Sequence, residues 1–282
     1  MYRLWIENES GEMLELTNNN NYVVTDVDGL LSPDTVINKT ESVNIDGSKY
    51  NSSKVNERTL SLTILPEYPV EENRQQLYNF FKVKKAVTVH FKNKNREVKI
   101  AGRFTKIDGS LFARTQTLTV EILCNDPFFQ DRIRSIEDMA QVLSLFEFPF
   151  AIEEEGKEFS VINKTITKEI YNSGDVEAGF LITLRAVGTV VNPIIYDVNT
   201  RERFGLNFTM KYGDIIQINT NKGSKKVELI RDNITTNIIN SIKQGNKWLQ
   251  LRTGDNLFTY DCESGAENLY ITFEFANRYE GV

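Results

Sequence analysis

The stretch ILCNDPFFQD, from Ile122 to Asp131, ends one sequence pattern and begins another. It closes an alternating apolar run at a lone cysteine, turns on Asn-Asp-Pro and then places two phenylalanines side by side. A strand that ends in a small buried thiol before a proline turn indicates the wall of one domain. Two phenylalanines capping that core would contribute roughly 1.5–3 kcal/mol each if fully buried. We predict a domain-closing motif made of Cys124, Asp126, Pro127, Phe128 and Phe129.

The segments before this motif repeat the same alternation. Their apolar side chains recur at every second residue, and β-branched residues are frequent, as is typical of half-buried antiparallel strands. The predicted strands cover residues 59–65, 86–91, 96–104 and 117–124. The sequence KNKN, residues 92–95, separates two of them and predicts a hairpin tip.

One segment of the first half has helical periodicity. Glu71 and Glu72 come early, Leu77, Phe80 and Phe81 follow at helical spacing, and lysines come next. Acidic residues at the start and basic residues at the end favour a helix through its dipole. We predict one amphipathic helix over residues 71–82, packed on the sheet.

The second half has a different organisation. Residues 132–157 have the character of a linker, with apolar spacing that predicts a short helix over 139–146, ended by Phe148-Pro149-Phe150 and followed by an acidic run. From residue 158 short apolar segments alternate with turn residues about every eight to twelve positions, the spacing of a β-sandwich or jelly roll. We therefore predict a second all-β domain over 158–282.

Composition excludes several classes of protein. The net charge is −6, and it is spread evenly, since residues 1–131 carry 16 basic and 18 acidic residues. A dedicated nucleic-acid binder usually has a basic excess. The amino-terminal residues lack a signal-peptide pattern, and no apolar run approaches the roughly 20 residues that span a bilayer. We expect a protein made in a cytoplasm without membrane insertion.

Groups that could perform catalysis are scarce. The chain has one histidine, His90, on the strand face opposite Val87 and Val89, which predicts a solvent-facing or interface residue. A histidine-based zinc site or a Ser-His-Asp triad has too few histidines, and no phosphate-binding glycine loop occurs. The segment DVDG, Asp26–Gly29, lacks the later ligands of a calcium loop and is interpreted as a turn. We predict no enzyme activity, no metal and no cofactor.

The residues now suggest a family. Residues 45–131 run IDGSKY…ERTLSLTI…RQQLYNFF…VTVHF…REVKIAGRF…TQTLTVEILCNDPFF, an order that resembles the N-terminal domain of siphophage distal tail proteins, the baseplate hub component. The later stretches YNSGDVEAGFLITLRAVGTVVNPIIYDVNT, MKYGDIIQINTNKGSKKVELIRD and WLQLRTGDNLFTYD resemble the C-terminal domain of the same family. The resemblance covers nearly the whole chain.

This resemblance implies a mainly β protein. The N-terminal domain, residues 1–131, would be a β-sandwich with one helix and a hairpin, and it would form a homohexameric ring. Residues 132–157 would be a linker, and residues 158–282 a galectin-like β-sandwich on the outside. Galectin-like describes the fold and does not imply sugar binding.

The implied function is that of a structural hub in the baseplate at the tip of a long non-contractile phage tail. Its partners would be itself, the tail tube protein, the tail-associated hub or lysin protein, the tape-measure protein and the receptor-binding protein. DNA would meet the hub only in transit through its channel, and the protein, made in the bacterial host cytoplasm, would reside in the virion tail tip.

The stretch from Lys82 to Lys106 contains nine basic residues and one acidic residue, Glu97. Solvated strand faces and a lysine-blunted sheet edge explain such a stretch, and contact with nucleic acid or an acidic partner is the alternative. We take the hairpin 87–104 as the ring-forming edge and Lys92, Lys94 and Arg96 as candidate interface residues. Two rival functions remain open, a carbohydrate-binding adhesin for the host wall and, less favoured, a glycoside hydrolase.

Overall fold

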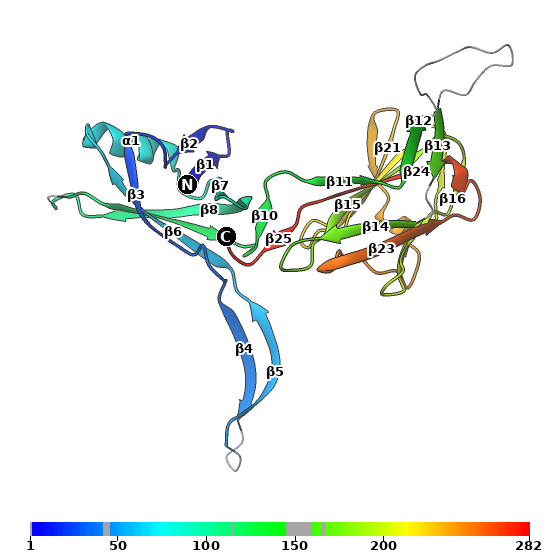
Figure 1. Ribbon diagram of the computed structural model, residues 1–282, viewed down its shortest axis with the longest axis horizontal. Helices are drawn as coiled ribbons and strands as arrows, with labels where there is room; N and C mark the ends of the chain where they lie inside the picture. Colours follow the sequence, from blue (N-terminus) through cyan, green and yellow to red (C-terminus); the bar gives the residue numbers. More distant parts are fainter. Residues whose placement is uncertain (1, 42–45, 114, 145–159, 165–166) are drawn as a thin grey trace. The chain divides into compact units, whose positions relative to one another are not determined.

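The computed structural model describes residues 2–41, 46–113, 115–144, 160–164 and 167–282 (Figure 1). The chain divides into two compact units. Unit 1 consists of Met1–Arg132 and Arg278–Val282, and unit 2 consists of Ile133–Asn277. The chain therefore leaves unit 1, builds unit 2 and returns to unit 1 for its last five residues.

Unit 1 is one antiparallel sheet with a single helix and a projecting hairpin. The path of the sheet is β2-β1-β7-β8-β9-β6-β3, with β10 and β25 joined to it at β8. Its elements are β1 (Arg3–Asn8), β2 (Met13–Glu15), β3 (Tyr22–Asp28), β4 (Thr35–Glu41), β5 (Ser48–Val55), β6 (Arg58–Pro66), α1 (Val70–Phe80), β7 (Ala86–Lys92), β8 (Glu97–Gly109), β9 (Leu118–Cys124), β10 (Phe129–Asp131) and β25 (Arg278–Tyr279).

The alternation of apolar and polar residues in the sequence explains why these segments form a sheet. In β6 and β9 every second residue is buried, and the apolar residues of one face join a single core. Helix α1 covers that core with Leu77 and Phe80, and Glu71 and Glu72 lie in its first turn, as predicted. The predicted basic last turn is absent from α1, although the Lys82 ammonium, just beyond it, donates to the carbonyl of Tyr78 at 3.1 Å.

Unit 2 is a sandwich of two main sheets. A six-stranded sheet, β11-β24-β15-β20-β21-β22, and a four-stranded sheet, β14-β23-β17-β18, contribute their inward faces to one core. The elements are β11 (Ser135–Asp138), β12 (Ala140–Ser144), β13 (Ser160–Lys164), β14 (Thr167–Asn172), β15 (Phe180–Ala186), β16 (Val190–Val191), β17 (Ile194–Asp197), β18 (Glu202–Gly205), β19 (Thr209–Met210), β20 (Ile215–Asn219), β21 (Lys226–Arg231), β22 (Ile234–Asn237), β23 (Gly254–Asp261) and β24 (Leu269–Phe275), with short 3-10 turns at Ile239–Ser241 and Ala266–Asn268.

Phenylalanines from both sheets fill the centre of this sandwich. Phe180, Phe258 and Phe273 are fully buried, and their ring centroids lie 5.3–5.7 Å apart. Aromatic pairs at such distances add to the free energy of burial. The mainly β class predicted from the sequence is confirmed.

The predicted domain boundaries differ from the observed units in two places. Residues 135–138 pair with β24 inside unit 2, so the predicted linker 132–157 already contributes to the second unit. The predicted short helix over 139–146 is wrong where the structure describes it, because Ala140–Ser144 is strand β12, paired with β13. Phe148-Pro149-Phe150 and the acidic run lie outside the described residues.

The second difference concerns the chain end. Strand β25 pairs with β10 in unit 1, so the predicted domain 158–282 is too long by its last five residues. A two-residue strand gives no periodicity from which its partner could be inferred. The predicted turn DVDG is also shorter than expected, since Asp26 and Asp28 belong to β3 and only Gly29, with φ +86°, lies in the turn.

Candidate interaction surfaces

The domain-closing motif is the anchor that receives the end of the chain. Cys124 and Phe129 are fully buried, as predicted. Phe128 is only half-buried and does not join the core cluster, so the prediction that both phenylalanines cap the core is wrong for Phe128. Asp126 accepts an ion-pair hydrogen bond from Arg278, which lies over the Phe128 ring at 4.9 Å.

Arg58, which the sequence did not single out, holds this anchor together. Its side chain is buried, and Nε donates to the carbonyl of Pro127 at 2.7 Å. The two other nitrogens donate to the carbonyls of Gly29, Leu31 and Glu280. Burial lowers the pKa of the guanidinium from its ordinary value, yet an arginine stays charged at neutral pH.

The aromatic neighbours of Arg58 and Arg96 complete this connection. The Arg58 guanidinium lies 4.7 Å from the centroid of the buried Phe129 ring. Arg96 lies 4.2 Å from the centroid of the Tyr279 ring and donates to the carbonyl of Gly281 at 3.2 Å. Cation–π contacts of this kind favour a fixed orientation of the ring. The last five residues are therefore an integral part of unit 1.

The three candidate interface residues lie at the β7–β8 hairpin tip, but they have different surroundings. The Lys92 ammonium pairs with Glu97 at 2.6 Å, Lys94 is exposed, and Arg96 is used inside unit 1. The prediction that the hairpin 87–104 is a sheet edge is wrong, because β7 pairs with β1 and β8, and β8 pairs with β9 and β10. Backbone groups along these strands are already occupied by unit 1.

The sheet face opposite the core carries the single histidine. The sequence predicts that His90 faces solvent or lies at an interface. The solvent-facing alternative is wrong, since its side chain is only 6% exposed, and the interface alternative stays a prediction. Its ring stacks on Trp5 with centroids 5.1 Å apart and planes 4° from parallel, and Nε2 lies 3.2 Å from a Glu7 carboxylate oxygen. Burial lowers the pKa of His90, while Glu7 raises it and the charges of Arg132 and Lys99 lower it.

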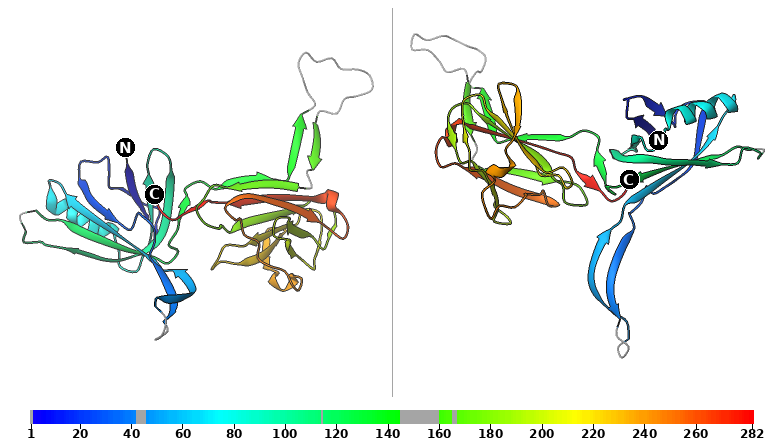
Figure 2. Two further views of the ribbon diagram at one scale, coloured as in Figure 1. Left: turned by 60° about the horizontal axis from the view of Figure 1, so that its bottom comes forward. Right: turned by 180° about the vertical axis from the view of Figure 1, so that it is seen from behind.

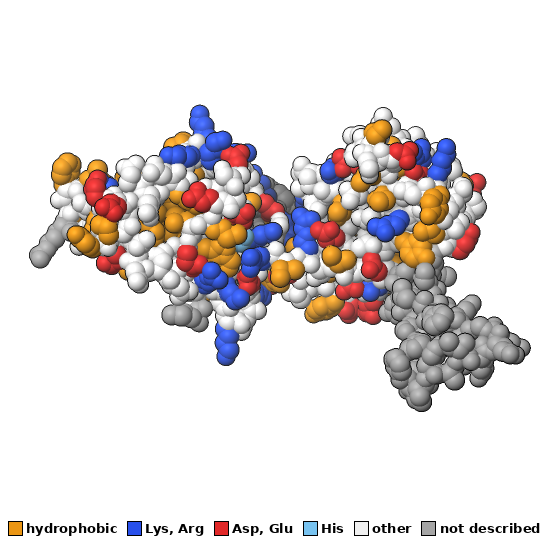
Figure 3. Space-filling view, turned by 90° about the horizontal axis from the view of Figure 1, so that it is seen from above, with side chains coloured by type: hydrophobic (Ala, Val, Ile, Leu, Met, Phe, Trp, Pro, Cys, Tyr) orange, Lys and Arg blue, Asp and Glu red, His pale blue; other side chains and the backbone are white. Residues whose placement is uncertain are grey.

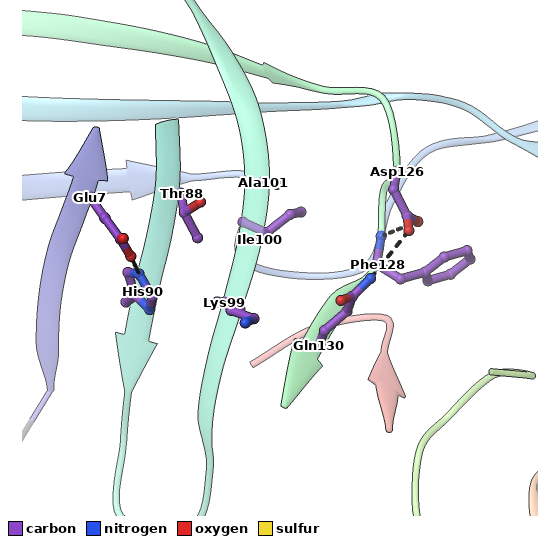
Figure 4. Close-up of a pocket in the computed structure, with 9 residues that line it drawn as sticks. All are labelled: Glu7, Thr88, His90, Lys99, Ile100, Ala101, Asp126, Phe128 and Gln130. Carbon is purple, nitrogen blue, oxygen red and sulfur yellow. Dashed lines mark hydrogen bonds and ion pairs between the residues drawn. The ribbon is translucent and has the colours of Figure 1, made fainter. Parts of the chain in front are cut away.

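A hollow of about 460 Å³ adjoins this histidine within unit 1 (Figure 4). Glu7 from β1, Thr88 and His90 from β7, Lys99 from β8 and Gln130 from β10 lie around it. Ile100, Ala101, Asp126 and the half-buried Phe128 complete its lining. We call this hollow the basin.

A feature that the sequence analysis missed is a long arm formed by β4 and β5. The two strands pair only with each other among the described residues, and every residue of both is exposed. Figures 1 and 2 show the arm extending away from the remainder of unit 1. Four large apolar side chains lie on it, with exposures of 37% for Val36, 58% for Ile37, 61% for Tyr50 and 37% for Val55.

The polar surface offers no obvious catalytic or metal centre in the described part of the chain. No group of three or more His, Cys, Asp or Glu side chains there could hold a metal ion. No described helix has the length and apolar character needed to cross a bilayer. On the face drawn in Figure 3 basic and acidic side chains are interspersed, so that face has no extended basic area.

Family comparisons agree with the architecture of both units. Residues 9–124 match the phage tail protein RIFT-related domain, and residues 173–279 match the C-terminal domain of the siphovirus-type tail component. The two matches lie in succession and together span most of the chain. The chain belongs to the siphophage distal tail protein family. Membership gives it the role of a structural component of the phage tail.

Solved structures of other phage tail and baseplate proteins share the fold at low sequence identity. The SPP1 Dit protein, described as a paradigm of the hub adsorption apparatus in phages that infect Gram-positive bacteria, is 11% identical, with a TM-score of 0.70 over 98% of each chain. A chain of the phage P2 baseplate in its activated conformation with Ca is 10% identical, with a TM-score of 0.56 over 100% of each chain. No curated protein sequence matches this chain.

Proposed function

We propose that this distal tail protein forms a homohexameric ring that acts as the hub of a siphophage baseplate. The ring joins the tail tube to the tail-associated hub or lysin protein and to receptor-binding proteins, and its channel passes the tape-measure protein and then DNA. The protein is made in the host cytoplasm, functions in the virion tail tip and has no enzymatic activity. Unit 1 forms the ring, and unit 2 is available for other partners.

The exposed arm is the observation that carries this proposal. An isolated two-stranded hairpin is marginally stable in water at best. The β4–β5 arm has no described packing partner in its own chain, and it exposes Ile37 and Tyr50. Exposed apolar side chains on such a projecting element indicate a surface that packs against another chain.

A second copy of the chain fits the arm better than an unrelated partner. A ring of like subunits requires heterologous contacts whose rotation closes, and each subunit must then reach onto the next. An arm that leaves its own sheet makes such a contact without using the paired strands of the sheet. The proposed number of six subunits in the ring comes from the resemblance to the family.

The hairpin tip remains a second candidate contact. Among the three proposed residues only Lys94 is both exposed and without a side-chain partner among the described residues of unit 1, so its charge can be reversed without breaking a contact there. Reversal of Lys92 would place a second acid beside Glu97, and reversal of Arg96 would disturb Tyr279. We expect K94E to weaken assembly without unfolding the chain.

The experiment shortens the arm at its base. The Asn56 amide donates to the carbonyl of Asp34 at 2.9 Å, so a short turn joining these two residues should leave the sheet intact. Light scattering should give a hexamer mass for the full chain and a monomer mass for the shortened chain. The matched control is F112S, which removes a fully exposed aromatic side chain outside the arm. A shortened chain that still assembles would refute the role of the arm.

A further inference from the structure

The basin is built from side chains in register across four strands of unit 1. Trp5 pairs with His90, His90 with Lys99, and Lys99 with Gln130, so one row crosses β1, β7, β8 and β10. In the neighbouring row Thr88 lies opposite Ala101, whose small side chain leaves room above the sheet. Because these strands are interior to the sheet, the shape of the basin is fixed by backbone pairing.

The charges at the basin leave one cation uncommitted. The Glu7 carboxylate is engaged by His90, and Asp126 is engaged by Arg278. Lys99 is half-buried and has no ion-pair partner in the part of the chain that the structure describes. Elsewhere on the same sheet Lys92 pairs with an acid at 2.6 Å, and Lys106 does likewise. A lysine that lines a hollow and has no anion beside it favours an anionic ligand.

The buried histidine is a second, independent sign of a ligand. Its Nδ1 atom is buried and has no hydrogen-bond partner among the described residues. Since Glu7 accepts at Nε2, the proton of the neutral ring belongs on Nε2, and Nδ1 is left as an unpaired acceptor. An unpaired buried polar atom costs about 1–3 kcal/mol. An anion in the basin would favour the imidazolium form, in which Nδ1 becomes a donor.

The other residues that line the basin indicate what kind of anion fits it. The hollow is also lined by Phe128, an apolar residue, and by Thr88 and Gln130, whose hydroxyl and amide are neutral hydrogen-bonding groups. A volume of about 460 Å³ is within the range of specific ligand sites and exceeds the need of a bare inorganic ion. A carboxylate on a short aliphatic stem could pair with the Lys99 ammonium while its stem contacts Phe128.

We propose that the basin binds the carboxylate of an acidic side chain, of the glutamate type, carried by a partner protein. Lys99 forms the ion pair, Phe128 contacts the stem, and His90 responds to the added negative charge. Such a contact adds specificity more than affinity, because an interfacial ion pair loses hydration on both sides. Occupancy of the basin does not depend on ring formation.

The chain's only histidine makes the site directly observable. Protein labelled with carbon-13 at histidine alone gives a single imidazole, which lies in the basin wall. Titration with N-acetyl-glutamic acid methylamide should shift this resonance saturably, with half-saturation in the millimolar range, and binding should tighten as the pH falls from 7.5 to 6. The charged groups that face the imidazole are Glu7 on β1, Lys99 on β8 and Arg132 after β10.

Two comparisons make the test decisive. K99M should weaken binding at least tenfold, with K99Q as a second variant should the first fail to fold, whereas K222M, at an exposed lysine of unit 2, should bind as the wild type does. N-acetyl-glutamine methylamide should not bind. The absence of a shift in the wild type, equal binding of the glutamine compound or inorganic phosphate, or unchanged binding to K99M would each overturn the proposal.

Discussion

Replacing Arg58 by methionine removes a buried guanidinium while it keeps most of the aliphatic stem. The side chain makes four hydrogen bonds to main-chain carbonyls, those of Gly29, Leu31, Pro127 and Glu280. Two of these carbonyls lie in the turn after β3, one in the domain-closing motif and one in the last five residues. The substitution therefore disconnects three separate segments of unit 1 at once.

The expected loss follows from the number of bonds. At a net value of roughly 1 kcal/mol for each hydrogen bond, the four bonds together give about 3–4 kcal/mol. We use the value for a typical hydrogen bond and not the higher value for a bond to a charged group, because Leu31 and Glu280 are exposed and water can hydrogen-bond to their carbonyls in the variant. A change of that size lowers the melting temperature of a domain this large by roughly 10 °C.

Calorimetry of the full chain separates the two units. We expect R58M to lower the melting temperature of unit 1 by roughly 10 °C and to leave the melting temperature of unit 2 unchanged. The matched control is R3M, since Arg3 makes an exposed ion pair with Glu15 and its loss should lower the melting temperature of unit 1 far less than R58M does. Deleting Arg278–Val282 should destabilise the same unit, and the combination with R58M should cost less than the sum. If R58M costs no more than R3M, the anchoring role of Arg58 is refuted.

Three further predictions follow from the same structure. Burial raises the pKa of Cys124 to about 12, so a thiol reagent at pH 8 should leave Cys124 unmodified in the native protein and should label both cysteines after denaturation. The pKa of His90 in the folded protein lies below its ordinary value, so the stability that depends on neutral His90 should be complete above pH 6.5 and decline as the pH falls below it. Denaturant titrations at several pH values should show this decline in the free energy of unfolding for the wild type and not for H90Q. The fragment 133–277 should unfold cooperatively by itself, whereas the fragment 1–132, without β25, should be less stable than unit 1 of the full chain.

The elements with strict periodicity could be predicted from the sequence. Strands β6, β7, β8 and β9 and helix α1 fall within a few residues of their predicted positions, because an alternating or helical apolar pattern has one way to face a core. The segment 139–146 was ambiguous for the same reason. Its apolar spacing also suits a strand, and the pairing of β12 with β13 decided the outcome.

The contacts that depend on distant segments could not be predicted. His90 lies on the polar face of its strand, yet Trp5 on a neighbouring strand covers it. Arg58 looks like an ordinary strand residue until the chain end returns to it. The arm carries a mixed polar and apolar sequence with no face to bury in its own unit, so its signal was weak.

Electron microscopy of the purified chain tests the hub assignment most directly. The account predicts ring-shaped particles with six-fold symmetry, in which the β4–β5 arm of one subunit contacts unit 1 of its neighbour. Should the purified chain remain monomeric, the same ring is predicted at the tip of intact phage tails that contain this protein. A tail tip in which this chain is present without a six-fold ring would contradict the account.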